Sequence, residues 1–311
     1  MKDLRVSTNH LLNNMMKGVG NQLSRLNDLS QDIATGKRVT KPSDDPVAAS
    51  RGLALRALRS GLRQHKSNVA DGRDWLMTTE TALMNLNDLF EQANVLVLDA
   101  ANQTRSDKDK EAFVQELDRI IEEAVAVLNT RHDDRYIFAG LATTTKPFSL
   151  ENGEIVYYGA NDADGRKEIE IEPGMTMQIN VNGKLAFMTD LEEAGNRSVL
   201  KTLIDVREHV AESYSSPTFH DDIAQDIDAI AVVEDHILNH VTSVGAKVRN
   251  LQRTSAKLDQ NEVEIESLLS KTEDADIAKA VVELELQKTV YMAILYSTSD
   301  IMKTSLLDYL R

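Results

Sequence analysis

The sequence contains no cysteine among its 311 residues. A disulfide framework, a thiol nucleophile and a thiolate metal site are therefore all excluded. Aromatic residues make up only 5 % of the chain, and proline occurs five times. A globular enzyme of this length usually has more aromatic residues, because large rings fill a thick core, whereas paired helices mainly use aliphatic side chains at their contacts. The composition favours long helices over a compact globule.

Net positive charge and long apolar runs are also missing. Lysine and arginine number 35 against 50 aspartate and glutamate residues, so the net charge is -15. This charge repels phosphate backbones and anionic lipids, and no basic patch offsets it, so we expect the protein to bind neither nucleic acid nor membranes. The first ten residues are polar and lack the apolar core of a secretory signal peptide. We expect a protein that stays in the cytoplasm or leaves the cell without a cleaved signal.

An apolar repeat with alternating steps of four and three residues indicates the first helix. Such a repeat is typical of a coiled-coil seam. Its members are Leu12, Met16, Val19, Leu23, Leu26, Ser30 and Ile33. Gly36 is placed to end this helix, because glycine readily adopts the left-handed conformation that follows a helix C-terminus. A second helix is predicted from Pro46 to about Ala101, with a kink or a short break near Asp71–Asp74, where the repeat loses its phase.

The longest regular pattern lies in the second half of the chain. Apolar residues keep one register from His220 to Leu269, which predicts a helix roughly 70 Å long. Residues 271–276 interrupt it, and Thr272 or Asp274 can cap a last helix. This last helix is apolar on more than one side, at Leu284, Tyr291, Ile294, Leu295, Ile301, Met302, Leu306 and Leu307. Since a surface helix normally has one apolar stripe, we expect another molecule to cover the rest.

The pattern changes between Tyr136 and about Leu191. Short alternating runs such as EIVYYGA, KEIEIE and TMQINV are separated by turn sequences, which predicts a small β-rich domain. The predicted fold class is therefore mainly α, a long antiparallel coiled-coil or helical rod formed by both chain ends with a small inserted β-domain. The expected domains are a terminal coiled coil (1–45 plus 271–311), a helical rod (46–135 plus 192–270) and the inserted β-domain (136–191).

The corner between the first two helices combines a glycine, two prolines, basic residues and an aspartate pair. The aspartates beside the basic residues could belong to a metal or phosphate site, but no glycine-rich phosphate loop follows a strand. Asp45 is placed to cap the second helix, and Pro46 suits the first helical position, where its missing N–H costs nothing. We therefore interpret Gly36, Pro42, Asp44, Asp45 and Pro46 as a structural joint.

His236 and His240 are the best candidates for metal ligands. A spacing of four residues places both imidazoles on one face of a helix, as in many zinc sites. Both residues, however, flank apolar seam positions, and no third ligand belongs to a recognisable motif. A structural role is favoured, and a metal-dependent enzyme is the minor alternative. We expect no catalytic residue, no metal and no cofactor.

Three segments resemble the flagellin family. LSQDIATGKRVTKPSDDPVAAS (29–50) is similar to the flagellin N-terminus, and EDADIAKAVVELELQKTVYMAILYSTSDIMKTSLLDYLR (273–311) is similar to the flagellin C-terminal helix. DDRYIFAGLATTTKPF (133–148) resembles a segment of the branch of this family that joins the flagellar hook to the filament. A short filament flagellin is the alternative within the family.

The resemblance implies a structural protein of the bacterial flagellum, not an enzyme. It implies self-association in a ring or helical layer between hook-associated protein 1 and the flagellin filament, with the terminal helices lining a central tube. It also implies an extracellular location, type III export without a cleaved signal peptide, and an export chaperone on the C-terminal helix. The assembly interface would comprise Leu12, Met16, Val19, Leu23, Leu26, Ile33, Leu284, Tyr291, Ile294, Leu295, Ile301, Met302, Leu306 and Leu307.

Overall fold

The computed structural model describes residues 2–101, 107–160, 165–195, 197–212, 216 and 218–309. Within its helices, the side chains of 2–9, 11–12, 107–109 and 301–309 lie outside this description. The chain divides into two compact units. Unit 1 contains residues 1–61 and 261–311, and unit 2 contains residues 62–260. The three-domain division expected from the sequence stays a prediction.

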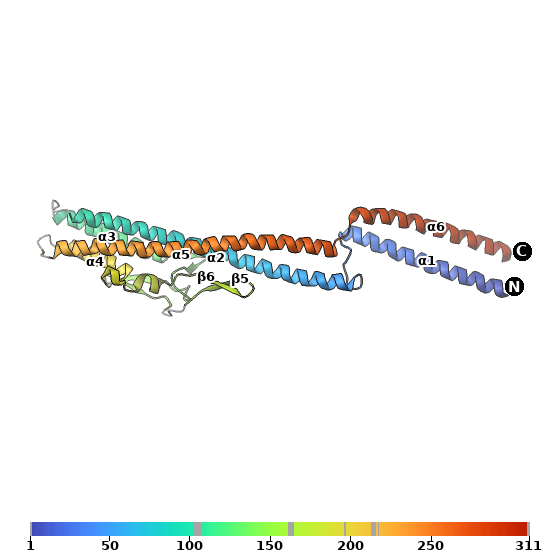
Figure 1. Ribbon diagram of the computed structural model, residues 1–311, viewed down its shortest axis with the longest axis horizontal. Coiled ribbons are helices and arrows are strands. Elements are labelled where there is room, and N and C mark those ends of the chain that lie inside the picture. The colour runs from blue at the N-terminus through green and yellow to red at the C-terminus, as the bar shows by residue number, and fades with distance from the viewer. Residues whose placement is uncertain are drawn as a thin grey trace. The chain divides into compact units, whose positions relative to one another are not determined.

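Unit 1 is built from helices at both ends of the chain. Helix α1 (Lys2–Thr35) and helix α6 (Ile277–Tyr309) run side by side in opposite directions, so that the two chain ends lie close together (Figure 1). The first part of α2 (Pro46–Ala100) and the last part of α5 (Phe219–Glu273) complete the unit. These bounds confirm the predicted second helix, and the predicted long helix extends one residue further at its start and four further at its end.

The helix ends in unit 1 follow the expected capping chemistry at two of three places. Gly36 has a φ of +70° directly after α1, as a C-terminal glycine should. Asp45 Oδ1 accepts the N–H groups of Val47 and Ala48 at 3.1 and 3.0 Å, which caps α2. At α6 the prediction was wrong, because the cap is Asp276, whose Oδ1 accepts the N–H of Lys279 at 3.1 Å.

Unit 2 packs the rest of α2 and α5 with two shorter helices, α3 (Asp107–Leu128) and α4 (Val199–Ala211). Three two-stranded antiparallel hairpins lie between α3 and α4 in the sequence. The first is β1 (Arg131–His132) with β2 (Arg135–Tyr136), the second β3 (Phe148–Glu151) with β4 (Glu154–Tyr157), and the third β5 (Glu168–Glu172) with β6 (Met175–Gln178). A π-helical segment, η1 (Lys184–Met188), and a 3-10 turn, η2 (Glu192–Ala194), follow.

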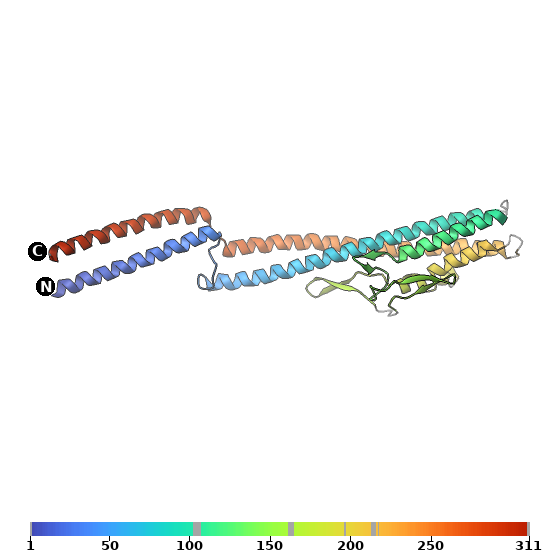
Figure 2. The same cartoon turned by 180° about the vertical axis from the view of Figure 1, so that it is seen from behind.

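The hairpin region shares one hydrophobic core with the helices of unit 2. In Figure 2 the strands lie along one side of the helices. Phe138, Phe148 and Phe187 are fully buried in this core, and their rings contact one another edge to face. The inserted segment therefore stabilises the helices, and they stabilise it in turn.

The helix has no break near Asp71–Asp74, since α2 continues through Gly72. A Cβ atom at Gly72 would collide with the side chain of Ile169, on strand β5. Trp75, one turn later, is buried in the same region. The coiled-coil repeat is interrupted here because the helix meets a β-hairpin instead of another helix. No helix in the described part of the chain is long and apolar enough to cross a membrane.

Candidate assembly surface and joint

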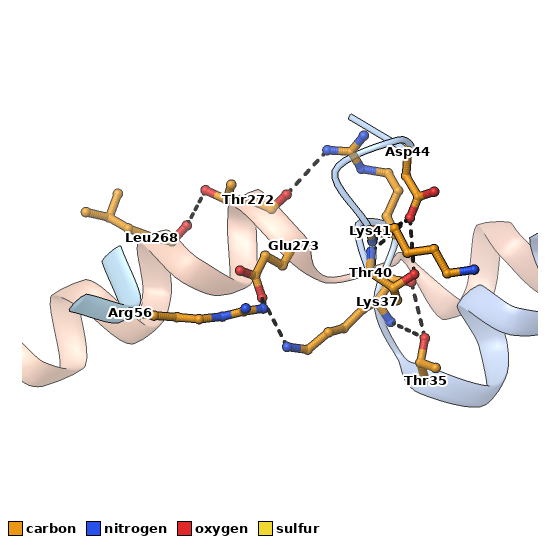
Figure 3. A network of polar contacts seen from close by, with 10 residues as sticks. Thr35, Lys37, Thr40, Lys41, Asp44, Arg56, Leu268, Thr272 and Glu273 are labelled. Atoms are coloured by element: carbon orange, nitrogen blue, oxygen red, sulfur yellow. Dashed lines mark hydrogen bonds and ion pairs between the residues drawn. The ribbon is translucent and has the colours of Figure 1, made fainter. Parts of the chain in front are cut away.

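The aspartate pair of the corner acts on the backbone. Asp44 Oδ2 accepts the N–H groups of Lys41 and Thr40 at 2.8 and 3.1 Å, and it also accepts the Thr40 hydroxyl (Figure 3). These backbone hydrogen bonds, first of all the one from Lys41, lower the pKa of Asp44. The hydrogen bond from the Ala48 N–H is the main cause of the lowered pKa of Asp45. Both carboxylates fold the corner, in agreement with the interpretation as a structural joint.

The basic residues of the corner bind the end of α5. Glu273 Oε2 accepts hydrogen bonds from Lys37 Nζ at 3.0 Å and from Arg56 Nη2 at 2.6 Å, which joins the corner, α2 and α5 (Figure 3). The Arg38 N–H donates to the Glu273 carbonyl oxygen at 2.7 Å, and the Ala275 N–H donates to the Gly36 carbonyl oxygen at 2.9 Å. Both side-chain and backbone hydrogen bonds thus hold the corner against the end of α5.

Glu273 is the residue that sequence reasoning missed. Its side chain is only 3 % exposed. Burial would raise its pKa, but the hydrogen bonds from Arg56 and Lys37 outweigh burial, and the pKa of Glu273 is lower than usual. The available signal was Gly52, a glycine inside a helix, because a Cβ atom there would collide with the Glu273 carboxylate.

Helix α1 has a half-buried seam that differs from the predicted one. The half-buried set with steps of four and three residues is Met15, Val19, Gln22, Leu26, Leu29 and Ile33. Met16 and Leu23, expected in the seam, are 64 % and 49 % exposed. Contacts with α6 include an ion pair of Arg25 with Glu283 at 3.5 Å and the approach of Thr298 Oγ1 to Met15 Sδ at 4.0 Å.

Helix α6 pairs with α1 along one side and has exposed apolar side chains, together with charged ones such as Glu285 and Lys288, on the others. Its buried and half-buried set includes Ala280, Leu284, Gln287, Tyr291, Ile294 and Thr298. Exposed apolar side chains form a second set, Ile277, Val281, Val282, Leu286, Met292, Leu295 and Tyr296. At 100° per residue, this second set extends from the edge of the seam to the opposite face of the helix. We call it the α6 outer surface.

The structure separates the predicted interface residues into two groups. Val19, Leu26, Ile33, Leu284, Tyr291 and Ile294 are half-buried in the terminal pair, whereas Met16, Leu23 and Leu295 are exposed. The side chains of Leu12, Ile301, Met302, Leu306 and Leu307 lie outside the described residues. Exposed apolar area of this extent is typical of a surface that another protein covers.

No other centre with obvious chemistry emerges in the described part of the chain. There, no group of three or more His, Asp or Glu side chains is arranged to hold a metal ion. His236 and His240 do meet, with their Nε2 atoms 3.2 Å apart, and His236 also contacts the Ala186 carbonyl oxygen.

Comparisons with known proteins relate the chain to bacterial flagellar proteins. Residues 6–143 match the family model described as the bacterial flagellin N-terminal helical region. The chain is 29 % identical over 187 residues to flagellar hook-associated protein 3 of Salmonella typhimurium, a match that covers 59 % of this chain and 57 % of that protein. It thus spans little more than half the length of this curated relative.

Two solved structures have the same fold. The flagellar junction protein FlgL from Legionella pneumophila superposes with a TM-score of 0.62 at 14 % identity, over 72 % of this chain and 100 % of that one. FlgL from Bacillus cereus superposes with a TM-score of 0.57 at 22 % identity, over 70 % of this chain and 99 % of that one. Residues 6–143 are therefore similar to the bacterial flagellin N-terminal helical region, and the chain is similar in sequence and fold to the FlgL group of flagellar hook-associated proteins.

Proposed function

We propose that this protein is a structural subunit of the bacterial flagellum that forms the junction layer between hook-associated protein 1 and the flagellin filament. The α6 outer surface carries the proposal, because Val282 and Tyr296 are 71 % and 77 % exposed on the face opposite the seam. A soluble helix pair gains nothing from such residues, whereas a subunit in a closed layer buries them against its neighbours. The names of the similar proteins support the same assignment.

The proposed mechanism is coupled folding and binding. Burying a leucine-sized side chain completely contributes about 1.5–3 kcal/mol. The seven members of the α6 outer surface together offer several kcal/mol that only an assembly can use. The joint around Glu273 would hold the terminal pair at a fixed angle to the rest of unit 1, so that neighbouring copies meet in one register. No enzymatic step belongs to this function.

The partners follow from the position of the layer. Copies of this chain would contact each other laterally within the layer. The layer would contact hook-associated protein 1 on one side and flagellin on the other. The same apolar α6 surface would need protection before assembly, so an export chaperone on the C-terminal helix fits an extracellular protein exported without a cleaved signal peptide. The terminal, rod and inserted domains expected from the sequence would then be the tube-lining, connecting and outward parts.

The decisive experiment locates the protein along the flagellum. A labelled copy should appear only at the base of each filament, and cells without the gene should carry hooks without filaments while secreting unassembled flagellin. A label along the whole filament would contradict the proposal.

A short filament flagellin is the second candidate, because the matched family model describes flagellins. The purified protein separates the two functions. A filament protein should polymerise alone when seeded with filament fragments, whereas a junction protein should add a limited layer and stop.

A further inference from the structure

Two histidines of α5 and one carbonyl group of η1 converge in unit 2. His236 Nε2 lies 3.2 Å from His240 Nε2 and 3.0 Å from the carbonyl oxygen of Ala186. The two imidazole rings meet edge to face, with centroids 4.7 Å apart. Both histidine side chains are half-buried, so the cluster is accessible from solvent.

Hydrogen bonds account for only one of the two close contacts of His236 Nε2. The Ala186 carbonyl oxygen can only accept, so His236 must carry its proton on Nε2 to donate to it. The nearby Nε2 of His240 then presents a lone pair to a nitrogen whose proton already points at the carbonyl group. A single proton thus lies among three atoms with lone pairs, namely Nε2 of His236, Nε2 of His240 and the carbonyl oxygen of Ala186.

The separations of His236 Nε2 from the other two atoms suit a metal ion. In a tetrahedral zinc site with metal–nitrogen bonds of about 2.0–2.1 Å, neighbouring ligand atoms are about 3.3 Å apart. The separations of 3.2 and 3.0 Å come close to this value without any movement of the backbone.

We propose that His236, His240 and the Ala186 carbonyl oxygen form a binding site for a divalent transition-metal cation such as Zn²⁺, with water as the fourth ligand. Imidazole nitrogen is a preferred ligand for Zn²⁺, whereas Mg²⁺ prefers oxygen ligands throughout. On binding, neutral His236 moves its proton from Nε2 to Nδ1, so both Nε2 lone pairs face the metal and the net charge of the ligands does not change.

The net charge of the chain, -15, favours the approach of a cation, whereas the positive charge of Lys247 near His240 opposes it.

The site has a structural consequence that is independent of the flagellar role. Ala186 belongs to the inserted segment and both histidines belong to α5, so a bound cation would fasten η1 to the long helix. A metal that binds only the folded state stabilises it by mass action. The melting temperature of unit 2 should rise with the Zn²⁺ concentration.

Titration calorimetry on the full chain tests the site, with ZnCl₂ and MgCl₂ as probes. One Zn²⁺ should bind per chain, and excess Mg²⁺ should not displace it. His240→Gln should weaken binding by more than the roughly 10-fold that loss of a supporting residue costs in known sites. The matched control is His220→Gln, in the first turn of the same helix, which should bind Zn²⁺ like the unaltered protein.

Long-range ¹H–¹⁵N NMR of the unaltered chain adds a readout that does not depend on a variant. Zn²⁺ should move the His236 proton from Nε2 to Nδ1. Equal Zn²⁺ affinity in His240→Gln and the unaltered chain would overturn the proposal. So would an unchanged His236 tautomer at saturating Zn²⁺, and this second result decides the matter if circular dichroism shows that His240→Gln alters the fold.

Discussion

Tyr296→Asp should prevent filament attachment while leaving the isolated chain folded. Leu251→Asp should instead unfold unit 2 of the isolated chain. Tyr296 belongs to the α6 outer surface and is 77 % exposed, whereas Leu251 lies in the seam of α5 and is fully buried. The two substitutions introduce the same charge on helices of similar regularity, so they differ mainly in surroundings.

The expected free-energy changes are far apart. Removing a buried leucine side chain costs about 2–5 kcal/mol, and placing a carboxylate in the remaining apolar space costs several kcal/mol more. At Leu251 the sum approaches the whole stability of a typical domain, about 5–15 kcal/mol. At Tyr296 the isolated chain should lose less than about 1 kcal/mol, as at most exposed positions. In the assembled layer, every subunit would bear the desolvation cost of the new carboxylate.

Circular dichroism melting of both purified variants, together with filament counts and swimming assays in a strain that lacks the unaltered gene, measures the contrast. Leu141→Asp is the control for added charge, because Leu141 is 56 % exposed but lies in the inserted segment. If Tyr296→Asp lowers the melting temperature as much as Leu251→Asp, α6 is part of an ordinary core. If Tyr296→Asp still supports normal filaments, the α6 outer surface is not the assembly surface.

Three further predictions concern the joint, the core and the histidine pair. Glu273→Gln should loosen the joint by about 1.5–3 kcal/mol, the usual loss for hydrogen bonds to charged groups, and should speed limited proteolysis between α1 and α2. Because the folded-state pKa of Glu273 is lowered, the unaltered joint should keep this contribution above pH 4.5 and lose it as the pH falls through the folded value, which proteolysis at graded pH would show. Phe187→Ala should cost about 3–5 kcal/mol in urea unfolding, since Phe187 is fully buried. In metal-free buffer, NMR should find His240 neutral down to about pH 4, and its lowered pKa should leave stability unchanged above pH 6.5 but reduce it as the pH falls toward 4, because the unfolded chain takes up the proton first.

The long helices could be predicted from the sequence because their signals are local. The α2 bounds followed from Asp45, Pro46 and the apolar repeat, and the α5 bounds from one unbroken register. Alternating residues and turn sequences likewise identified β4, β5 and β6, whereas β3 was not among the predicted runs. These patterns act over a few residues, so tertiary contacts seldom overrule them.

The seam of α1 was harder to predict, because two apolar stripes overlap on that helix. Val19, Leu26 and Ile33 belong to both stripes. The repeat of four and three residues fits equally well whether the stripe includes Met15 or Met16. Only the placement of α6 decides between them. The stripe not used within the chain remains exposed, which a pattern from one sequence cannot reveal.

Long-range ionic contacts were out of reach for a similar reason. Glu273 lies in a polar interruption between two helices and is separated from Lys37 by most of the chain. Nothing in its neighbours indicates that it will be buried. The contacts of Lys37 and Arg38 with Glu273 and Thr272 could not be identified from spacing either.

The terminal pair is closed less tightly than the helices of unit 2, and this difference bears on how the protein assembles. Leu251 and Leu258 of α5 are almost completely buried, whereas most seam positions of α1 and α6 are only half-buried. In the described residues, Gln22 and Gln287 also have side-chain oxygens that are buried without a hydrogen-bond partner, which costs about 1–3 kcal/mol each. We therefore expect hydrogen exchange in the isolated chain to be much faster at seam amides of α1 and α6 than at those of α5 near Leu251, and to slow when the protein enters the flagellum. Equal protection in the isolated chain would mean that the terminal pair is already stable, and coupled folding would no longer explain its exposed apolar surface.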